Sequence, residues 1–543
     1  MYINEKILVG KGENKEAYIL PKMANRHGII SGASGSGKTI TLKVLAESFS
    51  DARVPVFLVD VKGDLAGCAF KGVSNSNIEE RIDKLGLEGF EFRKYPVTFW
   101  DVYGQYGHPI RTTVSKTGAR LLSKMLDLSD AQEGILSIAF KIAEDENLEL
   151  VDLKDLRSLL NYIGDKRKEY SLSYGNITTQ SVGSIQRNIL TLQEEGGDFF
   201  FGSPDFNIKD FIHYDADTGN GQINILHAST LFQKPNLYST FLLWLLTYLY
   251  NSMPEVGDLD KPKLVFFVDE AHLLFDNIPR TLLNSITQIV KLIRSKGIGV
   301  YFISQSPSDI PDEILSQLGN RIQHVLRYYT KNDEKSIKAA ANSFRMNPKL
   351  DTVEEIKNLG TGVALVSFQD EKGMPEMVEK VTILPPQSAM GAIDDDIRDE
   401  LIKNSYLYGK YETVIDDESA HEKITKVKDE ERLAKQEELD RIAKEKEEAL
   451  EAKQKEKEEK EAEKKRKEEE RIKKEEERAL EKQKREEEKA KKEAEREAAK
   501  KKREEEKAMK NSVGYKLGKK VVNKTTNKVI DKSLNKILKN IFK

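Results

Sequence analysis

One segment near the start of the chain reads Gly32-Ala33-Ser34-Gly35-Ser36-Gly37-Lys38-Thr39. It matches the pattern GxxxxGK[ST] in full, between a predicted strand at residues 27–31 and a predicted helix at 40–49. The glycines allow backbone N–H groups to turn toward phosphate oxygens, and the amino end of the helix adds partial positive charge. The Lys38 ammonium can reach the outer phosphates, and the Thr39 hydroxyl can ligate Mg²⁺. The segment therefore predicts a site for a nucleoside triphosphate, ATP, with Mg²⁺.

Apolar runs outside this segment predict the strands of a parallel sheet. They are continuously hydrophobic, which is typical of strands buried on both faces. Helical patterns separate them, among them a crossover helix at 282–296. Alternating strands and helices predict a three-layer α/β fold with a mostly parallel sheet. The expected strands are 54–60, 222–226, 264–268 and 299–303.

Two further regions complete the predicted core. Residues 110–200 show helical periodicity and predict a helical insertion. Two strands at 362–368 and 377–384 predict a closing hairpin, and residues 384–388 mark the expected end of the core.

Composition sets broad limits on the protein. Its 543 residues allow two to four domains. The single cysteine, Cys68, leaves no intramolecular disulfide and no cysteine-based zinc site, which suits a reducing cytoplasm. The N-terminus lacks the apolar core of a signal peptide, and the most apolar run, residues 241–250, is too short to span a bilayer. We therefore expect a cytoplasmic protein in which 241–250 form a buried helix.

An acidic pair, Asp269-Glu270, follows the strand expected at 264–268. Open α/β sheets bind ligands at the carboxyl ends of their strands. Asp269 would hold Mg²⁺ together with Thr39, and Glu270 would polarise the water that attacks the γ-phosphate. Such a pair alone is often a solvated strand end, but with the phosphate segment it predicts hydrolysis. His272, two residues on, is interpreted as a local packing or hydrogen-bonding residue.

Two other strand ends carry polar residues. Gln305 follows the strand expected at 299–303, where a polar side chain can contact the γ-phosphate or its attacking water. A simple turn before Pro307 is the alternative. Asp60 ends the strand expected at 54–60 and could line the same crevice, and a turn-forming role ahead of Gly63 is equally compatible with the sequence.

Several segments together resemble the HerA–FtsK group of DNA-pumping ATPases, and closely the bacterial HerA-like proteins formerly called domain of unknown function 853. The resemblance covers most of residues 5–390. It rests on residues 32–39, 60–65, 268–275, 294–300, 304–307 and 318–321.

This resemblance implies a RecA-like P-loop core assembled as a homo-oligomeric, hexameric ring, with helicase-like translocation on duplex DNA. In such rings an arginine of one subunit contacts its neighbour's γ-phosphate and stabilises charge in the transition state. Arg294 and Arg321 are the candidates for this role. An ordinary surface or ion-pair role is the alternative for each.

The C-terminal part of the chain differs sharply in composition. We expect a HerA-like ATPase domain at 1–395, a linker at 396–420 and a charged low-complexity helix at 421–510. The apolar residues of 453–510 are too sparse for a heptad seam, so an isolated helix is favoured, with a flexible polyampholyte as the alternative.

Residues 511–543 form the last expected segment, basic and amphipathic, with nine lysines and one acid. Such a segment suits an anionic membrane surface, nucleic acid or the groove of a protein partner. A locally docked or oligomer-packing helix is the alternative. Peripheral attachment to a membrane through this segment is therefore compatible with a cytoplasmic protein.

Three functions fit these observations. The leading one is an ATP-hydrolysing ring motor that acts on DNA, where the ATPase follows from the residues and the DNA from the resemblance. The core shows no long basic stripe that would identify a DNA channel. The second is an ATP-driven assembly or tethering ATPase acting on protein or membrane partners, and the third is a nucleotide-gated structural protein with little turnover.

Overall fold

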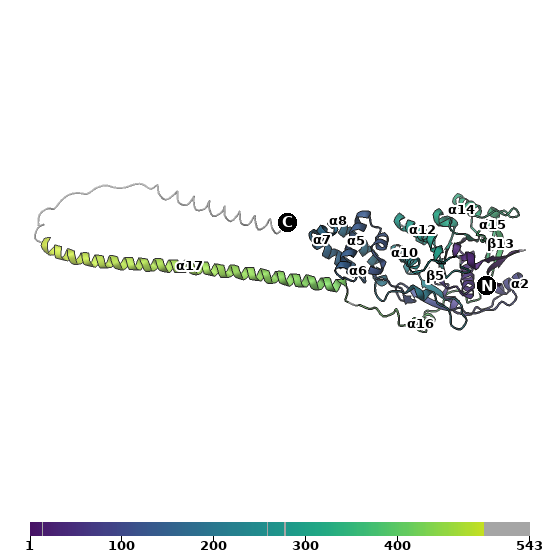
Figure 1. Ribbon diagram of the computed structural model, residues 1–543, viewed down its shortest axis with the longest axis horizontal. Coiled ribbons are helices and arrows are strands. Elements are labelled where there is room, and N and C mark those ends of the chain that lie inside the picture. The colour runs from purple at the N-terminus through teal and green to yellow at the C-terminus, as the bar shows by residue number, and fades with distance from the viewer. Residues whose placement is uncertain (14, 258, 276–278, 417, 494–543) are drawn as a thin grey trace. The chain divides into compact units, whose positions relative to one another are not determined.

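One mixed β-sheet organises the first part of the chain (Figure 1). The computed structural model describes residues 1–493 except 14, 258, 276–278 and 417. Chain contacts separate two units, Met1–Ala434 and Lys435–Lys543. The strands are β1 (Tyr2–Ile3), β2 (Lys6–Lys11), β3 (Glu16–Ile19), β4 (Gly28–Ser31), β5 (Val56–Asp60), β6 (Val97–Asp101), β7 (His108–Pro109), β8 (Ile223–His227), β9 (Leu264–Val268), β10 (Ile298–Ser304), β11 (Asn320–Gln323), β12 (Val363–Ser367) and β13 (Glu379–Ile383).

The described strands lie in the order β1-β2-β13-β12-β11-β4-β10-β9-β5-β8-β6-β7, with β3 paired to β2. From β11 through β7 every neighbouring pair is parallel, whereas the edge from β12 to β1 is antiparallel. Strand β4 lies between β10 and β11, so that Ser31 is aligned with both Ser304 and Gln323. The mostly parallel α/β sheet and the closing hairpin expected from the sequence are thus confirmed.

Helices cover this sheet and form a separate group between β7 and β8. The helix that follows β4 is α1, and α3 to α9 occupy the region expected as a helical insertion. The helices are α1 (Lys38–Asp51), α2 (Ser76–Leu85), α3 (Val114–Thr117), α4 (Ala119–Met125), α5 (Asp130–Asp145), α6 (Leu153–Asp165), α7 (Arg167–Tyr174), α8 (Thr179–Glu194), α9 (Gly197–Phe200), α10 (Pro235–Ser252), α11 (His272–Phe275), α12 (Arg280–Ile293), α13 (Asp312–Leu315), α14 (Lys331–Asn342), α15 (Thr352–Asn358), α16 (Asp395–Lys403) and α17 (Ala420–Glu493).

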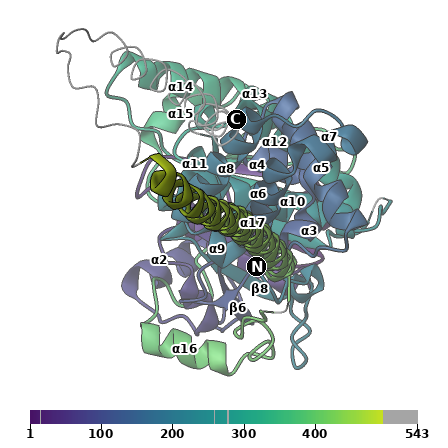
Figure 2. The same cartoon turned by 90° about the vertical axis from the view of Figure 1, so that its left-hand side faces the viewer.

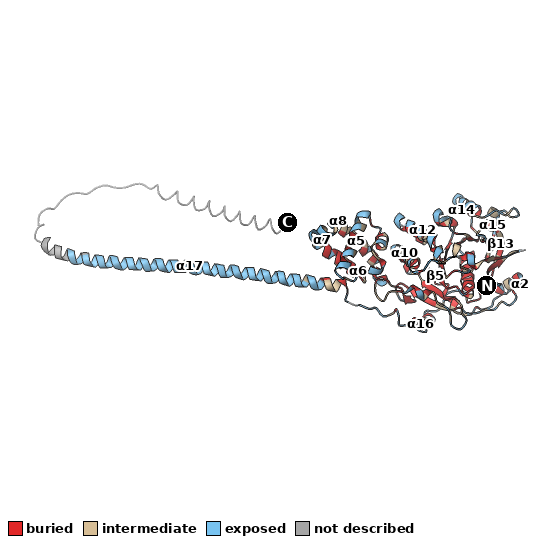
Figure 3. Ribbon diagram, in the orientation of Figure 1, coloured by how far each residue is buried: buried red, intermediate tan, exposed pale blue. Residues whose placement is uncertain are grey.

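The two faces of the sheet pack into different hydrophobic clusters. Successive side chains of a strand point to opposite faces, so Phe57 and Val59 of β5 join the cluster that contains α10 and α12. Val56 and Leu58 join the cluster that contains α1. Figure 3 shows the buried strands in red between these layers. Apolar surface on both faces explains why the central strands are continuously hydrophobic, and it produces the three layers.

Helices α1 and α10 are buried around most of their circumference. Eleven of the fourteen residues of α1 are buried, including Lys43 and Glu47. The apolar run 241–250 lies within α10, which packs against α4 and α12. No helix in the described part of the chain has the length and apolar character needed to cross a bilayer.

Some elements were not anticipated from the sequence. Strand β11 has four residues, three of them polar or charged, and it carries no apolar run that would predict a buried strand. The polar residue Asn320 is buried because its amide donates to the carbonyls of Met23 and His27. Helices α14 and α15 lie side by side beyond β11, as Figure 2 shows.

The segment that follows β13 packs onto the first unit. The buried Glu47 carboxylate accepts hydrogen bonds from the backbone N–H of Gln387 at 2.8 Å and of Ser388 at 3.0 Å. Farther along, the buried Arg398 of α16 stacks on Phe99 and contacts His227 Nδ1 at 2.9 Å. Residues 396–420, expected as a linker, therefore include part of a docked helix.

The charged helix expected at 421–510 is present as α17 as far as Glu493. In its part beyond Ala434, the side chains that the structure describes are exposed to solvent, and Glu456 pairs with Lys460 at 2.5 Å. Residues 494–510 and the basic segment 511–543 lie outside the described residues.

Substitution Glu47→Ala tests the attachment of the segment after β13. It leaves two buried backbone N–H groups without an acceptor, which costs about 1–3 kcal/mol for each group. We expect the free energy of unfolding, measured in urea, to fall by about 3 kcal/mol. Glu80→Ala, at an exposed glutamate of α2, is the control, with a change within about 0.5 kcal/mol. A Glu47→Ala protein as stable as this control would contradict the role of the carboxylate.

Candidate phosphate-binding site

The loop between β4 and α1 is held open by its glycines. Gly32, Gly35 and Gly37 have φ values of +154°, +73° and +111°. A Cβ on Gly32 would lie 2.5 Å from the Cβ of His324, so this position has no room for a side chain. A Cβ on Gly35 would meet nothing within 4 Å, but its positive φ still favours glycine. The loop therefore has a closely packed base and an open rim.

Neighbouring strands anchor the base of this loop. The Gly32 N–H donates to Ser304 O of β10 at 3.2 Å, and the Ala33 N–H donates to Val325 O, just beyond β11, at 2.8 Å. At the rim, within the described residues, the N–H groups of Gly35, Gly37 and Lys38 donate to no protein acceptor. Outward-facing N–H groups at a helix amino end are the donors that a phosphate group needs.

The Lys38 side chain turns back onto the loop. Its ammonium donates to Gly32 O at 2.6 Å and to Ala33 O at 3.2 Å. Burial lowers the pKa of Lys38, while the charges of Glu270 and Asp269 oppose this change. Lys38 therefore lies within electrostatic reach of both acids. Thr39 follows in the first turn of α1 and is partly buried.

His324 is a site residue that sequence reasoning missed. Its Nε2 lies 2.9 Å from Thr41 Oγ1, and its Nδ1 lies 3.2 Å from Val363 O. Burial lowers the pKa of His324 to about 4, so the ring is neutral at physiological pH. Its place under the loop depends on β11, which the sequence did not reveal as a strand.

Asp269 lies directly after β9, at the same edge of the sheet as the loop. The Glu270 N–H donates to its Oδ1 at 2.9 Å, whereas Oδ2 is buried and has no partner. Burial and the nearby charge of Glu270 raise the pKa of Asp269 to about 7. A buried carboxylate oxygen without a donor suits a metal ion, since Mg²⁺ prefers oxygen ligands. The donor set at this position thus fits the expected ion.

Glu270 adopts an unusual backbone conformation with φ of +46°. Its Oε1 accepts a hydrogen bond from Lys62 Nζ at 2.5 Å, and its buried Oε2 has no hydrogen-bond partner. His272 Nδ1 lies 3.3 Å from Oε2. Burial raises the pKa of Glu270, but the hydrogen bond and charge of Lys62, with His272 and Lys38, bring it below the ordinary value. A buried, ionised carboxylate therefore faces the region of the loop.

Asp60 has a turn role in this structure. Its Oδ1 accepts from the Gly63 N–H at 2.7 Å, and its Oδ2 accepts from the Leu65 N–H at 3.1 Å. Both oxygens thus shape the loop after β5. Burial raises the pKa of Asp60 to about 6.

Gln305 is exposed at the end of β10, next to the residue whose carbonyl anchors Gly32.

The two arginine candidates lie away from the loop of their own chain. The Arg321 guanidinium donates to the carbonyls of Leu318, Ser343 and Leu315 at 3.0–3.2 Å. Arg294 caps the carboxyl end of α12, near enough to influence the pKa of His27. Because His27 precedes β4, Arg294 lies near the strand end opposite the phosphate loop.

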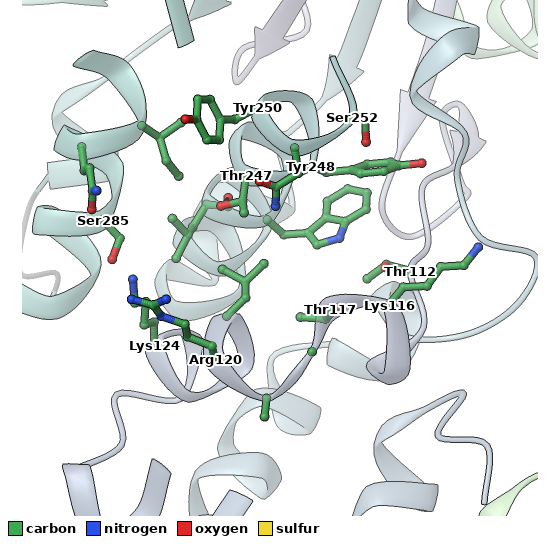
Figure 4. Close-up of a pocket in the computed structure, with 18 of the residues that line it drawn as sticks. Thr112, Lys116, Thr117, Arg120, Lys124, Thr247, Tyr248, Tyr250, Ser252 and Ser285 are labelled. Carbon is green, nitrogen blue, oxygen red and sulfur yellow. Dashed lines mark hydrogen bonds between the residues drawn. The ribbon is translucent and has the colours of Figure 1, made fainter. Parts of the chain in front are cut away.

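A separate cavity of about 800 Å³ lies among α4, α10 and α12 (Figure 4). Arg120 and Lys124 of α4 line one side, and Thr247 and Tyr248 of α10 line another. No residue of the phosphate loop or of the acid pair is among its lining residues. This cavity is therefore distinct from the predicted site.

Strand β4 leads through a glycine loop with free N–H groups into a buried helix, and an acid pair follows β9, two strands away. This arrangement defines a P-loop nucleotide-binding protein. Comparison with known families identifies the group. The family described as Helicase HerA-like C-terminal matches residues 5–486. The chain belongs to this family and is a HerA-like P-loop ATPase.

Individual relatives agree with this assignment. The "DNA double-strand break repair helicase HerA" of Sulfurisphaera tokodaii is 26% identical over 375 residues, covering 66% of each chain. The protein of the same name from Saccharolobus solfataricus is 23% identical over 358 residues, covering 65% of this chain and 64% of that one. The chain thus matches slightly less than two thirds of their length. Among solved structures, the bacterial conjugative coupling protein TrwB is similar with a TM-score of 0.46 and 16% identity, over 68% of this chain and 88% of that chain.

Proposed function

We propose that this protein is a motor that binds ATP with Mg²⁺ at the 32–39 loop and hydrolyses it. One observation carries the proposal: the loop's free N–H groups and Lys38 lie at the same sheet edge as Asp269 and Glu270. The N–H groups would hold phosphate oxygens. Lys38, which now donates to two loop carbonyls, would exchange them for the more basic oxygens of the outer phosphates.

The metal site of the proposal is formed by Thr39 and Asp269. The unpartnered Oδ2 of Asp269 and the hydroxyl of Thr39 would be the protein oxygens on Mg²⁺. The ion would neutralise charge on the β- and γ-phosphates. Asp269 must be ionised for this role, and its raised pKa means that binding would release a proton near neutral pH.

Glu270 is the proposed proton acceptor. Its Oε2 is buried and free of donors, so it can accept a hydrogen bond from the water that attacks the γ-phosphate. Gln305, exposed beside the loop, would contact the same water or the γ-phosphate. The metal ligands, the proton acceptor and the water-contacting amide would then all come from this edge of the sheet.

Nucleotide binding by Lys38 and hydrolysis by Glu270 can be separated by substitution. We expect Lys38→Ala to weaken binding of a fluorescent ATP analogue by roughly 10- to 100-fold, because a charge-assisted hydrogen bond is lost. We expect Glu270→Gln to bind the analogue normally but to lower kcat by roughly 10²- to 10⁴-fold.

The exposed residues Lys84 and Glu88 provide matched controls, as Lys84→Ala and Glu88→Gln. Normal turnover in Glu270→Gln would remove Glu270 from its role. Normal nucleotide affinity in Lys38→Ala would show that the ligand binds elsewhere.

A ring assembly is part of the proposal because the resemblance implies an arginine supplied by a neighbouring subunit, and the two candidate arginines lie away from the loop of their own chain. Arg294 and Arg321 are the two candidates to act on a neighbouring subunit's γ-phosphate, and Arg321 donates to three backbone carbonyls of its own chain. Mass photometry with and without ATP tests the assembly. We expect a hexamer with nucleotide, and a monomer under both conditions would contradict a role for either arginine in a neighbouring site.

DNA is the proposed substrate of the motor, which is supported by the names of the HerA relatives. We expect duplex DNA to raise the ATPase rate of the full chain. The increase should shrink as salt rises, since Lys and Arg contacts to phosphates are screened. Stimulation by a protein partner or by anionic vesicles, with none by DNA, would favour the assembly or tethering ATPase instead.

A further inference from the structure

An ion pair links the loop after β5 to the acid after β9. Lys62 Nζ lies 2.5 Å from Glu270 Oε1. The Glu270 side chain is 8% exposed and the Lys62 side chain 49% exposed. A half-exposed lysine therefore pairs with a carboxylate that is almost completely buried.

The backbone on the Lys62 side of this pair is fixed. Strands β5 and β9 are paired in parallel, with Val59 opposite Val268. Beyond Val59, the two Asp60 oxygens bind the N–H groups of Gly63 and Leu65 and close the loop around Lys62. Gly63 has a φ of +78°, which lets the chain turn there. Lys62 is thus held at a defined distance from the end of β9.

The backbone on the Glu270 side is fixed as well. Its φ of +46° is uncommon for a residue with a side chain and persists only where the surroundings enforce it. The next N–H, that of Ala271, donates to Ile303 O of β10 at 2.7 Å and provides this restraint. The direction of the Glu270 side chain is therefore set by the fold.

Lys62 uses only one of the two carboxylate oxygens. The other, Oε2, is buried without a donor, and His272 Nδ1 at 3.3 Å likewise has no hydrogen-bond partner. A carboxylate held at one oxygen cannot rotate freely, and its second oxygen keeps its lone pairs for an incoming donor. Orientation of this kind is what a proton acceptor needs before a water molecule arrives.

We propose that Lys62 is a positioning residue for Glu270: its ammonium holds Oε1 so that Oε2 accepts a proton from the attacking water. The inference rests on the proposed function, because it assigns a partner to the residue named there as proton acceptor. The alternative is an inhibitory contact, in which Lys62 keeps Glu270 from accepting a proton until ATP binds. In that case removing the lysine would raise kcat instead of lowering it.

Substitutions at Lys62 in the full chain test the proposal. We expect Lys62→Met to lower kcat by roughly 10- to 100-fold, while KM and the affinity for a fluorescent ATP analogue change by less than about threefold. Lys62→Arg should restore most of the activity because it keeps the charge and the donor. Lys71→Met, at an exposed lysine of the same segment, is the matched control and should retain wild-type kcat.

A double substitution separates action through Glu270 from a general structural effect. In the Glu270→Gln background, Lys62→Met should leave the residual rate unchanged within about twofold. Without nucleotide, the melting temperatures of the two single variants and the double variant should be non-additive, which reports the ion pair independently of activity.

Each other outcome overturns the proposal. A wild-type or raised kcat in Lys62→Met would show that the lysine does not position Glu270 or that it inhibits the site. An equal loss in the Glu270→Gln background would show that Lys62 acts elsewhere. If Glu270→Gln itself lacks an effect, or the wild-type protein hydrolyses no ATP, the proposed function fails together with this inference.

Discussion

The site depends on strand β10, which holds the phosphate loop and the acid pair at one edge of the sheet. Its Ser304 carbonyl accepts the Gly32 N–H, and its Ile303 carbonyl accepts the Ala271 N–H. The phosphate loop and the segment with the acid pair are more than two hundred residues apart in the sequence. Both are nevertheless hydrogen-bonded to consecutive residues of one buried strand. Because both bonds are backbone bonds, the spacing between the halves depends on the sheet rather than on any side chain.

Burial gives this edge its chemistry. Desolvation raises the pKa of Asp269 to about 7 and lowers that of Lys38, so each charge is costly until an opposite charge approaches. The pKa of Glu270, in contrast, lies below its ordinary value, because the hydrogen bond and charge of Lys62 outweigh the effect of burial. A magnesium-bound polyphosphate would bring both kinds of partner, a cation for Asp269 and anions for Lys38. The site is thus electrostatically prepared for such a ligand.

Segments that follow β13 pack onto α1 and onto strands β6 and β8. Glu47, within α1, fixes the segment after β13, and Arg398 of α16 packs against Phe99 and contacts His227. Residues beyond the predicted core therefore contribute to the same domain. The contacts of 396–420 use a stacked arginine, Arg398, and two buried side chains, Leu407 and Tyr411.

The phosphate loop, the central strands β4, β5, β8, β9 and β10, and the acid pair could be predicted without a structure, because each is a local pattern of residue type and spacing. Contacts between residues on different strands, by contrast, became visible only in the folded chain. The position of His324 under the loop depends on a four-residue strand with no apolar run. The pairing of Lys62 with Glu270 joins residues 208 positions apart, and the turn role of Asp60 became visible only with its two N–H donors in place. Such contacts arise from strand order and register, which no local pattern of residues encodes.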